Sequence, residues 1–189
     1  MNRDQIMKAV KQELPNKRWV HTLGVMKTAV SLAKTYGADP VKADLAALMH
    51  DYVKYWPMDK MRQVILEQGL PQELLDCDWE LWHAPVGAYA AKQEFGIEDE
   101  EILDAIRYHT SGRENMTTLD KVVCLADYIE PGRDFPGVND IRKLAKRSLD
   151  KALAEGFDTT LLYLISKHKP IFPLTLLARN SLIKFSSKM

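Results

Sequence analysis

Apolar residues recur along almost the whole chain at the spacing of an α-helix, and no stretch shows the sustained two-residue alternation of a β-strand. The segments between the helical patterns are short, and no repeat, low-complexity stretch or linker separates them. The pattern therefore predicts an all-α helical bundle. A chain of 189 residues is long enough for one domain with a sizeable core and short for two, so we expect a single domain over residues 1–189.

Prolines, glycines and capping residues mark the expected helix ends. Pro15 ends the first helix, and we expect Asn16 to cap the second, which Gly37 terminates. Asp39 followed by Pro40 is typical of a helix start. The expected helices cover about residues 4–14, 17–37, 40–51, 57–69, 85–95, 98–109, 118–129 and 139–153, the last stopping at Gly156, with two C-terminal helices on either side of residues 169–173.

Charge and composition exclude several classes of partner. The 26 basic and 26 acidic residues give a formal net charge of zero, so the chain has no broad electrostatic footprint for nucleic acid or for a membrane surface. No apolar run approaches the length of a transmembrane helix or of a signal core, and we expect a cytoplasmic protein. Its two cysteines, Cys77 and Cys124, are expected to stay reduced.

Polar side chains interrupt these apolar helices at six positions, which include four of the five histidines: His21, His50, Asp51, His83, His109 and Asp127. His21 shares one helical face with Val25, Ala29 and Leu32, so its imidazole points at the core. Burying an imidazole or a carboxylate is costly unless another group satisfies it. Each of these six side chains therefore needs a partner that satisfies its buried polar atoms.

Taken singly, each of the six has an ordinary structural explanation. A core histidine is often simply hydrogen-bonded, and Lys54, three residues beyond Asp51, is positioned to neutralise that carboxylate. Taken together, one shared metal centre would satisfy them all. The donors are nitrogen and carboxylate oxygen without cysteine, a set that suits iron, manganese or zinc in an open catalytic site.

Five stretches of the chain carry a more specific pattern around these residues: Arg18–Val25, Ala47–Lys54, His83–Ala88, Ala105–Gly112 and Leu125–Arg133. The His50-Asp51 doublet alone is a weak signal. Its combination with His-Ala-Pro-Val-Gly, Tyr-His-Thr and Ala-Asp-Tyr-Ile-Glu-Pro resembles the YqeK family of HD proteins, the symmetrical bis(5′-nucleosyl)-tetraphosphatases. The resemblance covers nearly the whole chain. One small departure is Met49, where leucine is usual.

The resemblance implies an HD-domain helical bundle that hydrolyses diadenosine tetraphosphate (Ap4A) to two molecules of ADP. We expect the metal-site core in about residues 16–130, with C-terminal helices over about 139–186 packing on it. The implied cofactor is iron, as one or two ions, with manganese or cobalt as substitutes. The iron ligands carry over to His21, His50 and Asp127, with Asp51 beside them. Nucleotide contacts carry over to Gly24, Asp51, His83, His109, Thr110, Asp127 and Arg133.

The chemistry of these residues agrees with that activity. A Lewis-acidic metal lowers the pKa of a bound water, which Asp51 is placed to orient. Arg133 offers a planar fork for phosphate oxygens, and Lys54 either neutralises phosphate or pairs with Asp51. His83 and His109 have two interpretations, as ligands of a second metal or as groups that contact phosphate and supply a proton. We count Asp51, Lys54, His83 and His109 as the candidate catalytic residues.

Alternative functions remain open at this stage. An HD-type nucleotidase or another nucleotide phosphohydrolase fits the same residues. A non-catalytic nucleotide- or partner-binding module is the third alternative, and loss of a ligand would mark it, whereas all six positions are intact here. The expected partners are a dinucleoside polyphosphate substrate and ADP, without nucleic acid or membrane. Trp82 or Phe172 is a candidate to flank an adenine ring. Leucines and isoleucines of the C-terminal helices either close the core or form a homodimer face: Leu174, Leu176, Leu177, Leu182 and Ile183.

Overall fold

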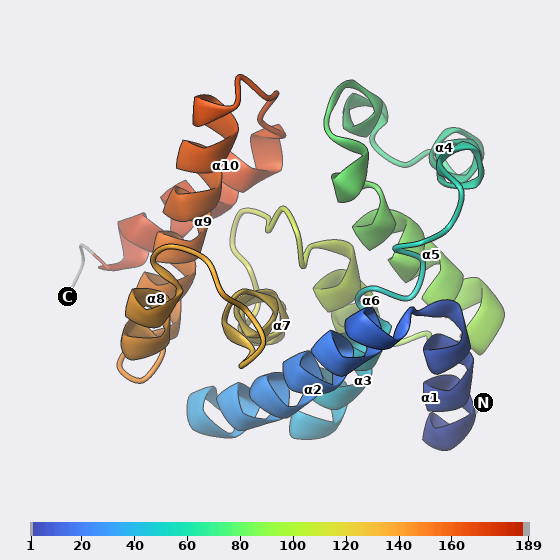
Figure 1. The fold of residues 1–189 in the computed structure, drawn as a ribbon, viewed down its shortest axis with the longest axis horizontal. Coiled ribbons are helices and arrows are strands. Elements are labelled where there is room, and N and C mark those ends of the chain that lie inside the picture. The colour runs from blue at the N-terminus through green and yellow to red at the C-terminus, as the bar shows by residue number, and fades with distance from the viewer. Residues whose placement is uncertain (1, 187–189) are drawn as a thin grey trace.

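The computed structural model describes the backbone of residues 2–186 and the side chains of residues 2–183. Within that part of the chain it has ten α-helices, two short 3-10 helices and no β-strand, which confirms the all-α prediction (Figure 1). The α-helices are α1 (Arg3–Glu13), α2 (Asn16–Tyr36), α3 (Pro40–Met49), α4 (Met58–Glu67), α5 (His83–Phe95), α6 (Glu100–Arg107), α7 (Thr118–Ile129), α8 (Val138–Leu144), α9 (Leu149–Ser166) and α10 (Pro173–Ser186). The 3-10 helices are η1 (Gln72–Asp76) and η2 (Trp79–Leu81).

The expected signals set most of the helix ends. Asp39 accepts hydrogen bonds from the first amides of α3, with Pro40 at the first helical position. Gly37 closes α2 in the left-handed conformation, with φ of 77°. The prediction that Asn16 caps α2 was wrong. Pro15 occupies the capping position, and Asn16 is the first helical residue.

The prediction of a single helix over residues 139–153 was also wrong, because α8 ends at Leu144 and α9 starts at Leu149. The hydroxyl of Ser148 caps α9 by accepting a hydrogen bond from an amide of its first turn. Gly156 does not stop α9, which continues to Ser166. A Cβ on Gly156 would lie 3.3 Å from the ring of Tyr128, so glycine there lets α9 pack closely on α7.

Two further differences concern segments that carry site residues. Helix α5 begins at His83, two residues before the expected start, and Pro85 is tolerated because the amides of a first helical turn have no intrahelical partner. Helix α6 ends at Arg107, which leaves His109 in the turn that follows. The 3-10 helices η1 and η2 were not expected.

Packing around α7 places these residues near one another. Helix α2 packs against α3 and α7, α6 packs against α3, α5 and α7, and α9 packs against α7, α8 and α10 (Figure 1). His50 directly follows α3, His83 begins α5, and His109 follows α6. His21 lies in the second turn of α2, and Asp127 lies in the last turn of α7. The site is therefore built from helix ends on five different elements.

Residues 122–126 in α7 are fully buried, which explains why they are apolar on all sides of the helix. Cys124 is among them, and both Cys124 and the partly exposed Cys77 are free thiols, as predicted. Leu182 of α10 is buried in the core, whereas Leu176 and Leu177 are exposed. Among the described residues, no helix combines the length and the apolar character that crossing a bilayer requires.

Candidate metal centre

The structure brings all six sequence-predicted polar residues together. The Nε2 atom of His21 lies 3.0 Å from Oδ1 of Asp127. The Nε2 atoms of His50 and His83 lie 3.1 Å from Oδ2 and Oδ1 of Asp51, respectively. The ring of His109 packs edge-on against that of His50, with 5.0 Å between centroids. Residues that are up to 106 positions apart in the sequence thus share one small buried volume.

The four histidines present the same ring nitrogen to this volume. Each uses Nδ1 for a hydrogen bond directed away from the centre, to a carbonyl three residues earlier or to a carboxylate: His50 to Ala47 (2.7 Å), His83 to Glu80 (2.5 Å), His109 to Ile106 (2.8 Å) and His21 to Oε1 of Glu130 (3.0 Å). Carbonyls and carboxylates only accept, so Nδ1 carries a proton. A neutral ring then has its Nε2 lone pair facing the centre, as metal-binding histidines do.

Two of these nitrogens lack a hydrogen-bond partner. In the described part of the chain, Nε2 of His21 and Nε2 of His50 are buried and make no hydrogen bond of acceptable geometry, although carboxylate oxygens lie nearby. Leaving such an atom unsatisfied costs about 1–3 kcal/mol. Donor atoms of His21, His50 and Asp127 lie within 4.8 Å of one another, as do those of His50, Asp51 and His109. These residues fit a divalent metal ion such as iron, manganese or zinc.

The electrostatics of the centre favour a cation. Burial alone would raise the pKa of the Asp51 carboxyl, but His50 and His83 outweigh burial and hold that pKa well below its ordinary value. In the same way, His21 and Arg133 overcome the effect of burial on Asp127 and keep its pKa well below the usual range. Burial lowers the pKa of His50, yet the neighbouring Asp51 more than offsets this and raises it. Two ionised carboxylates thus attract positive charge to this point.

His83 and His109 behave differently from His50. Burial, together with the charges of His83 and His50, lowers the pKa of His109 to about 3. Burial also lowers the pKa of His83, against the opposing effect of Asp51. Both rings are therefore neutral at physiological pH, and their Nε2 atoms lie only 3.1 Å apart. They offer ligand atoms or a site for one shared proton.

The cation beside Asp51 is Arg18, which the sequence analysis missed. Nη1 of Arg18 lies 2.9 Å from Oδ2 of Asp51. Lys54, which was expected there, instead lies 3.3 Å from Nδ1 of His83 and 3.9 Å from Oε2 of Glu80. The pairing predicted for Lys54 assumed that the helix continues past Asp51, whereas α3 ends at Met49. Arg18 precedes His21 by three residues and so lies on the same helical face, and this spacing was the available sequence signal for it.

A cleft of about 720 Å³ opens over the centre. It is lined by the predicted residues Asp51, Lys54, His83, His109, Thr110, Asp127 and Arg133, and by Arg18. Arg133 donates from Nε to the carbonyl of Asp127 and from Nη2 to its carboxylate. The facing wall comes from α9 and from the connection between α9 and α10, including Tyr163, Lys169 and Phe172. The cleft thus combines a metal-binding floor with several cations.

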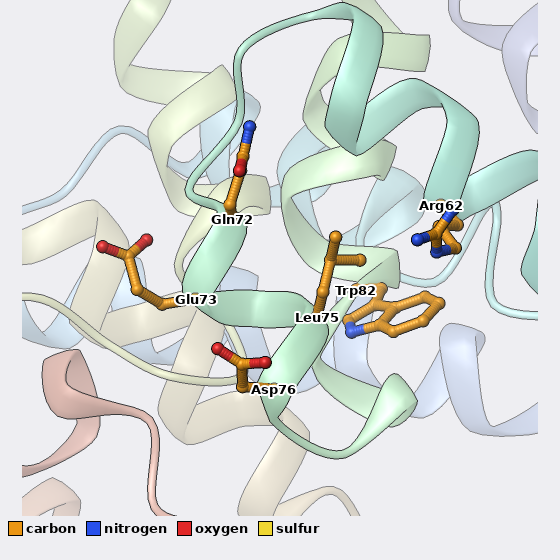
Figure 2. Close-up of a pocket in the computed structure, with 6 residues that line it drawn as sticks. All are labelled: Arg62, Gln72, Glu73, Leu75, Asp76 and Trp82. Carbon is orange, nitrogen blue, oxygen red and sulfur yellow. The ribbon is translucent and has the colours of Figure 1, made fainter.

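Four predicted residues do not line this cleft: His21 and His50, which belong to the centre itself, and Gly24 and Trp82. Gly24 faces the buried carboxylate of Glu130, a second residue that the sequence analysis missed. Trp82 lines a separate pocket with Arg62, Leu75 and acidic side chains (Figure 2). Its indole nitrogen donates to the carbonyl of Leu74. Of the two aromatic residues considered for an adenine ring, only Phe172 lies at the cleft.

Comparisons with known proteins agree with this geometry. The model of the HD domain family matches residues 18–132. The chain is 52% identical over 186 residues to a symmetrical bis(5′-nucleosyl)-tetraphosphatase of Bacillus subtilis, covering 98% of this chain and all of that protein. It is 49% identical to a protein of the same name from Halalkalibacterium halodurans, covering 97% and 98% of the two chains. A crystal structure of a predicted HD superfamily hydrolase involved in NAD metabolism from Clostridium acetobutylicum superposes with a TM-score of 0.93, at 42% identity and 98% coverage of both chains.

Proposed function

This chain belongs to the HD-domain family and, within it, to the YqeK family, and we propose that it hydrolyses diadenosine tetraphosphate to two molecules of ADP. The observation that supports this most strongly is the set of side chains at and above the floor of the cleft. His21, His50 and His83 place Nε2 3.0–3.1 Å from the carboxylates of Asp127 and Asp51. Arg18, Lys54 and Arg133 line the walls above. Such a floor suits a metal-dependent attack on phosphorus, and such walls suit a polyphosphate.

We propose that His21, His50 and Asp127 hold one iron ion, with Asp51 beside it, and that manganese or cobalt can substitute. The buried Nε2 atoms of His21 and His50, which have no hydrogen bond in the described residues, support this assignment. The bound ion would act as a Lewis acid that lowers the pKa of a water molecule and polarises a phosphoryl oxygen.

The side chains around the ion provide orientation and charge. Asp51 accepts a hydrogen bond from the attacking water, and Arg18, with Nη1 2.9 Å from Oδ2, keeps that carboxylate aligned. Arg133 presents its planar fork to phosphate oxygens, and Lys54 adds a second positive charge. Both cations would stabilise the negative charge that grows on the phosphoryl oxygens in the transition state.

The position of attack determines the products. In a symmetrical cut, the water oxygen bonds to one of the two central phosphorus atoms, and the bond from that phosphorus to the oxygen joining the two central phosphates breaks. The departing ADP takes the electron pair of that bond and needs a proton or a positive donor. The negative charge of the bound polyphosphate would favour protonation of the His83–His109 pair, whose Nε2 atoms lie 3.1 Å apart at the floor, and the pair would then supply that proton.

We further propose that two parts of the chain have different roles in the site. Residues 16–130 form the metal-site core, and residues 139–186 pack on it as C-terminal helices. Helix α9 contacts α7, which carries Asp127, and α10 contacts α9 (Figure 1). The C-terminal helices and their connection would therefore contribute the wall of the cleft that faces the metal-binding floor.

The test is turnover of diadenosine tetraphosphate by protein loaded with iron under anaerobic conditions, with the products separated by chromatography. We expect ADP as the sole product, and no turnover after chelation of the metal. Asp51→Asn is the control, with helicity near wild type and kcat reduced by more than about 100-fold, because even groups behind the metal ligands contribute 10–100-fold. AMP plus ATP as products would contradict the symmetrical cut. Phosphate release from AMP or dAMP, without action on the dinucleotide, would indicate a nucleotidase.

A further inference from the structure

Glu130 is a buried carboxylate that the proposed reaction does not use. It directly follows α7 and is 4% exposed. Its Oε1 lies 3.0 Å from Nδ1 of His21, and its Oε2 accepts a hydrogen bond of 2.6 Å from the amide of Gly132. The other three histidines of the centre use backbone carbonyls for the same purpose. Among the described histidines of the centre, His21 alone has a carboxylate as the partner of its Nδ1.

Two glycines leave the space that this carboxylate occupies. A Cβ on Gly24 would lie 2.5 Å from Oε2 of Glu130, closer than real Cβ contacts, and a Cβ on Gly132 would lie 3.0 Å from Oε1. Gly24 follows His21 by three residues, so both lie on one face of α2. The same helical face therefore supplies the imidazole and the room for its partner.

The backbone that carries Glu130 is held in place from α8. The guanidinium of Arg142 donates to three carbonyls around the turn, those of Ile129 (3.1 Å), Glu130 (2.8 Å) and Arg133 (2.9 Å). These contacts immobilise the turn that follows α7. The carboxylate of Glu130 is thus supported through its own backbone, through the amide of Gly132 and through the close approach of α2.

We propose that Glu130 is a positioning residue for the metal ligand His21, and that Gly24 and Gly132 are glycines because this carboxylate fills the space beside them. By holding the proton on Nδ1, Glu130 keeps Nε2 of His21 free and aimed at the centre. Its negative charge makes the imidazole a stronger donor than a carbonyl partner would. The inference rests on the proposed metal site, and it assigns Gly24 to metal binding through Glu130.

Replacement of Glu130 by glutamine tests this arrangement with little change in shape. Both neighbours of the carboxylate, Nδ1–H of His21 and the amide of Gly132, are donors. A glutamine amide has one acceptor and one donor end. It must leave one of these N–H groups without an acceptor, or force the His21 proton onto Nε2, where it blocks the metal. Either result weakens metal binding.

The first experiment titrates Mn²⁺ and Co²⁺ alone into the metal-free full chain against a competing chelator, without nucleotide. We expect Glu130→Gln to weaken metal affinity by about 10–100-fold. The matched control is Glu94→Gln, because Glu94 accepts a hydrogen bond from Tyr52 away from the centre. We expect the control to match wild type, and the Co²⁺ absorption spectrum to change only in the Glu130 variant. Wild-type affinity in Glu130→Gln, or an equal loss in Glu94→Gln, would overturn the proposal.

A second experiment isolates Gly24. We expect Gly24→Ala to weaken metal affinity in the wild-type background but to cause no further loss in a Glu130→Ala background, because the clash is with the carboxylate. Equal losses in both backgrounds would show that Gly24 acts independently of Glu130. Thermal unfolding of each metal-free variant verifies that it is folded. Neither experiment contains a nucleotide, so absence of Ap4A turnover would leave this inference standing.

Discussion

The Nε2 atoms of His83 and His109 lie 3.1 Å apart, although each ring donates its Nδ1 proton to a backbone carbonyl three residues earlier. Two neutral rings held in this way direct lone pairs at each other. Two lone pairs at this distance repel each other, so the pair provides a place where a cation or an incoming proton binds favourably. Because Oδ1 of Asp51 is also 3.1 Å from Nε2 of His83, the pair forms part of the reactive floor.

We expect His83→Ala to leave the metal content at one ion per chain while impairing catalysis, because His83 contacts phosphate in the proposed mechanism. A hydrogen bond to a charged group is worth about 1.5–3 kcal/mol, so kcat/KM should fall by about 10- to 150-fold. Metal analysis of the purified variant and steady-state kinetics provide the two readouts. A drop from two ions to one would instead assign His83 and His109 to a second metal.

Arg133→Met should mainly weaken substrate binding. Its guanidinium lies in the cleft and is already bound to Asp127, where a bidentate phosphate contact is within reach. We expect KM for diadenosine tetraphosphate to rise by about 10-fold or more, with a smaller change in kcat. Arg62→Met is the matched control, because Arg62 lines the separate pocket of Figure 2. An unchanged KM in Arg133→Met would contradict the phosphate contact.

Stability of the metal-free protein should depend on pH through His109. Its pKa is about 3 in the folded protein, against 6.5 for an unperturbed histidine, so the unfolded state binds one more proton between these values. The free energy of unfolding should therefore fall by up to about 1.4 kcal/mol for each pH unit below about 6.5. The raised pKa of His50 acts in the opposite sense, adding stability that is lost as pH rises above about 6.5.

Urea unfolding at several pH values between about 5 and 6.5, just below the pKa of an unperturbed histidine, measures this dependence. His109→Gln removes the titrating group and should flatten the dependence in this window. Above that window both proteins should respond alike, because His50 is present in each. Parallel curves for wild type and His109→Gln throughout would show that His109 does not carry the effect.

Gly112→Ala should destabilise the fold strongly. Gly112 has φ of +64°, and a Cβ there would lie 2.6 Å from Phe157 and 2.7 Å from Ala178. Left-handed strain of about 1–2 kcal/mol adds to an overpacking cost of about 1–3 kcal/mol. Gly37→Ala is the control, since Gly37 has φ of +77° with open space around it, and only the strain should appear. Equal losses in the two variants would exclude the overpacking component.

Site residues could be predicted where the pattern within one helix already indicated that a polar side chain is buried. His21 and Asp127 stood out because the residues around them are apolar at helical spacing, and burial of such groups demands a partner. Arg18 and Glu130 did not stand out. An arginine near a helix start and a glutamate before a proline are common on protein surfaces. Only the packing of α2 against α3 brings Arg18 to Asp51, and only its packing against α7 brings Glu130 to His21.

The sequence alone determined the all-α class, most helix positions and the six residues of the centre. The signals were hydrophobic periodicity, capping residues and polar residues within apolar runs, and each signal depends only on neighbours within one helix. Contacts between helices depend on crossing geometry, which no local pattern encodes. Only the tertiary structure therefore decided that Arg18 rather than Lys54 pairs with Asp51, and that every imidazole presents Nε2 to the centre. It also decided that α9 and its connection to α10 form the far wall of the cleft.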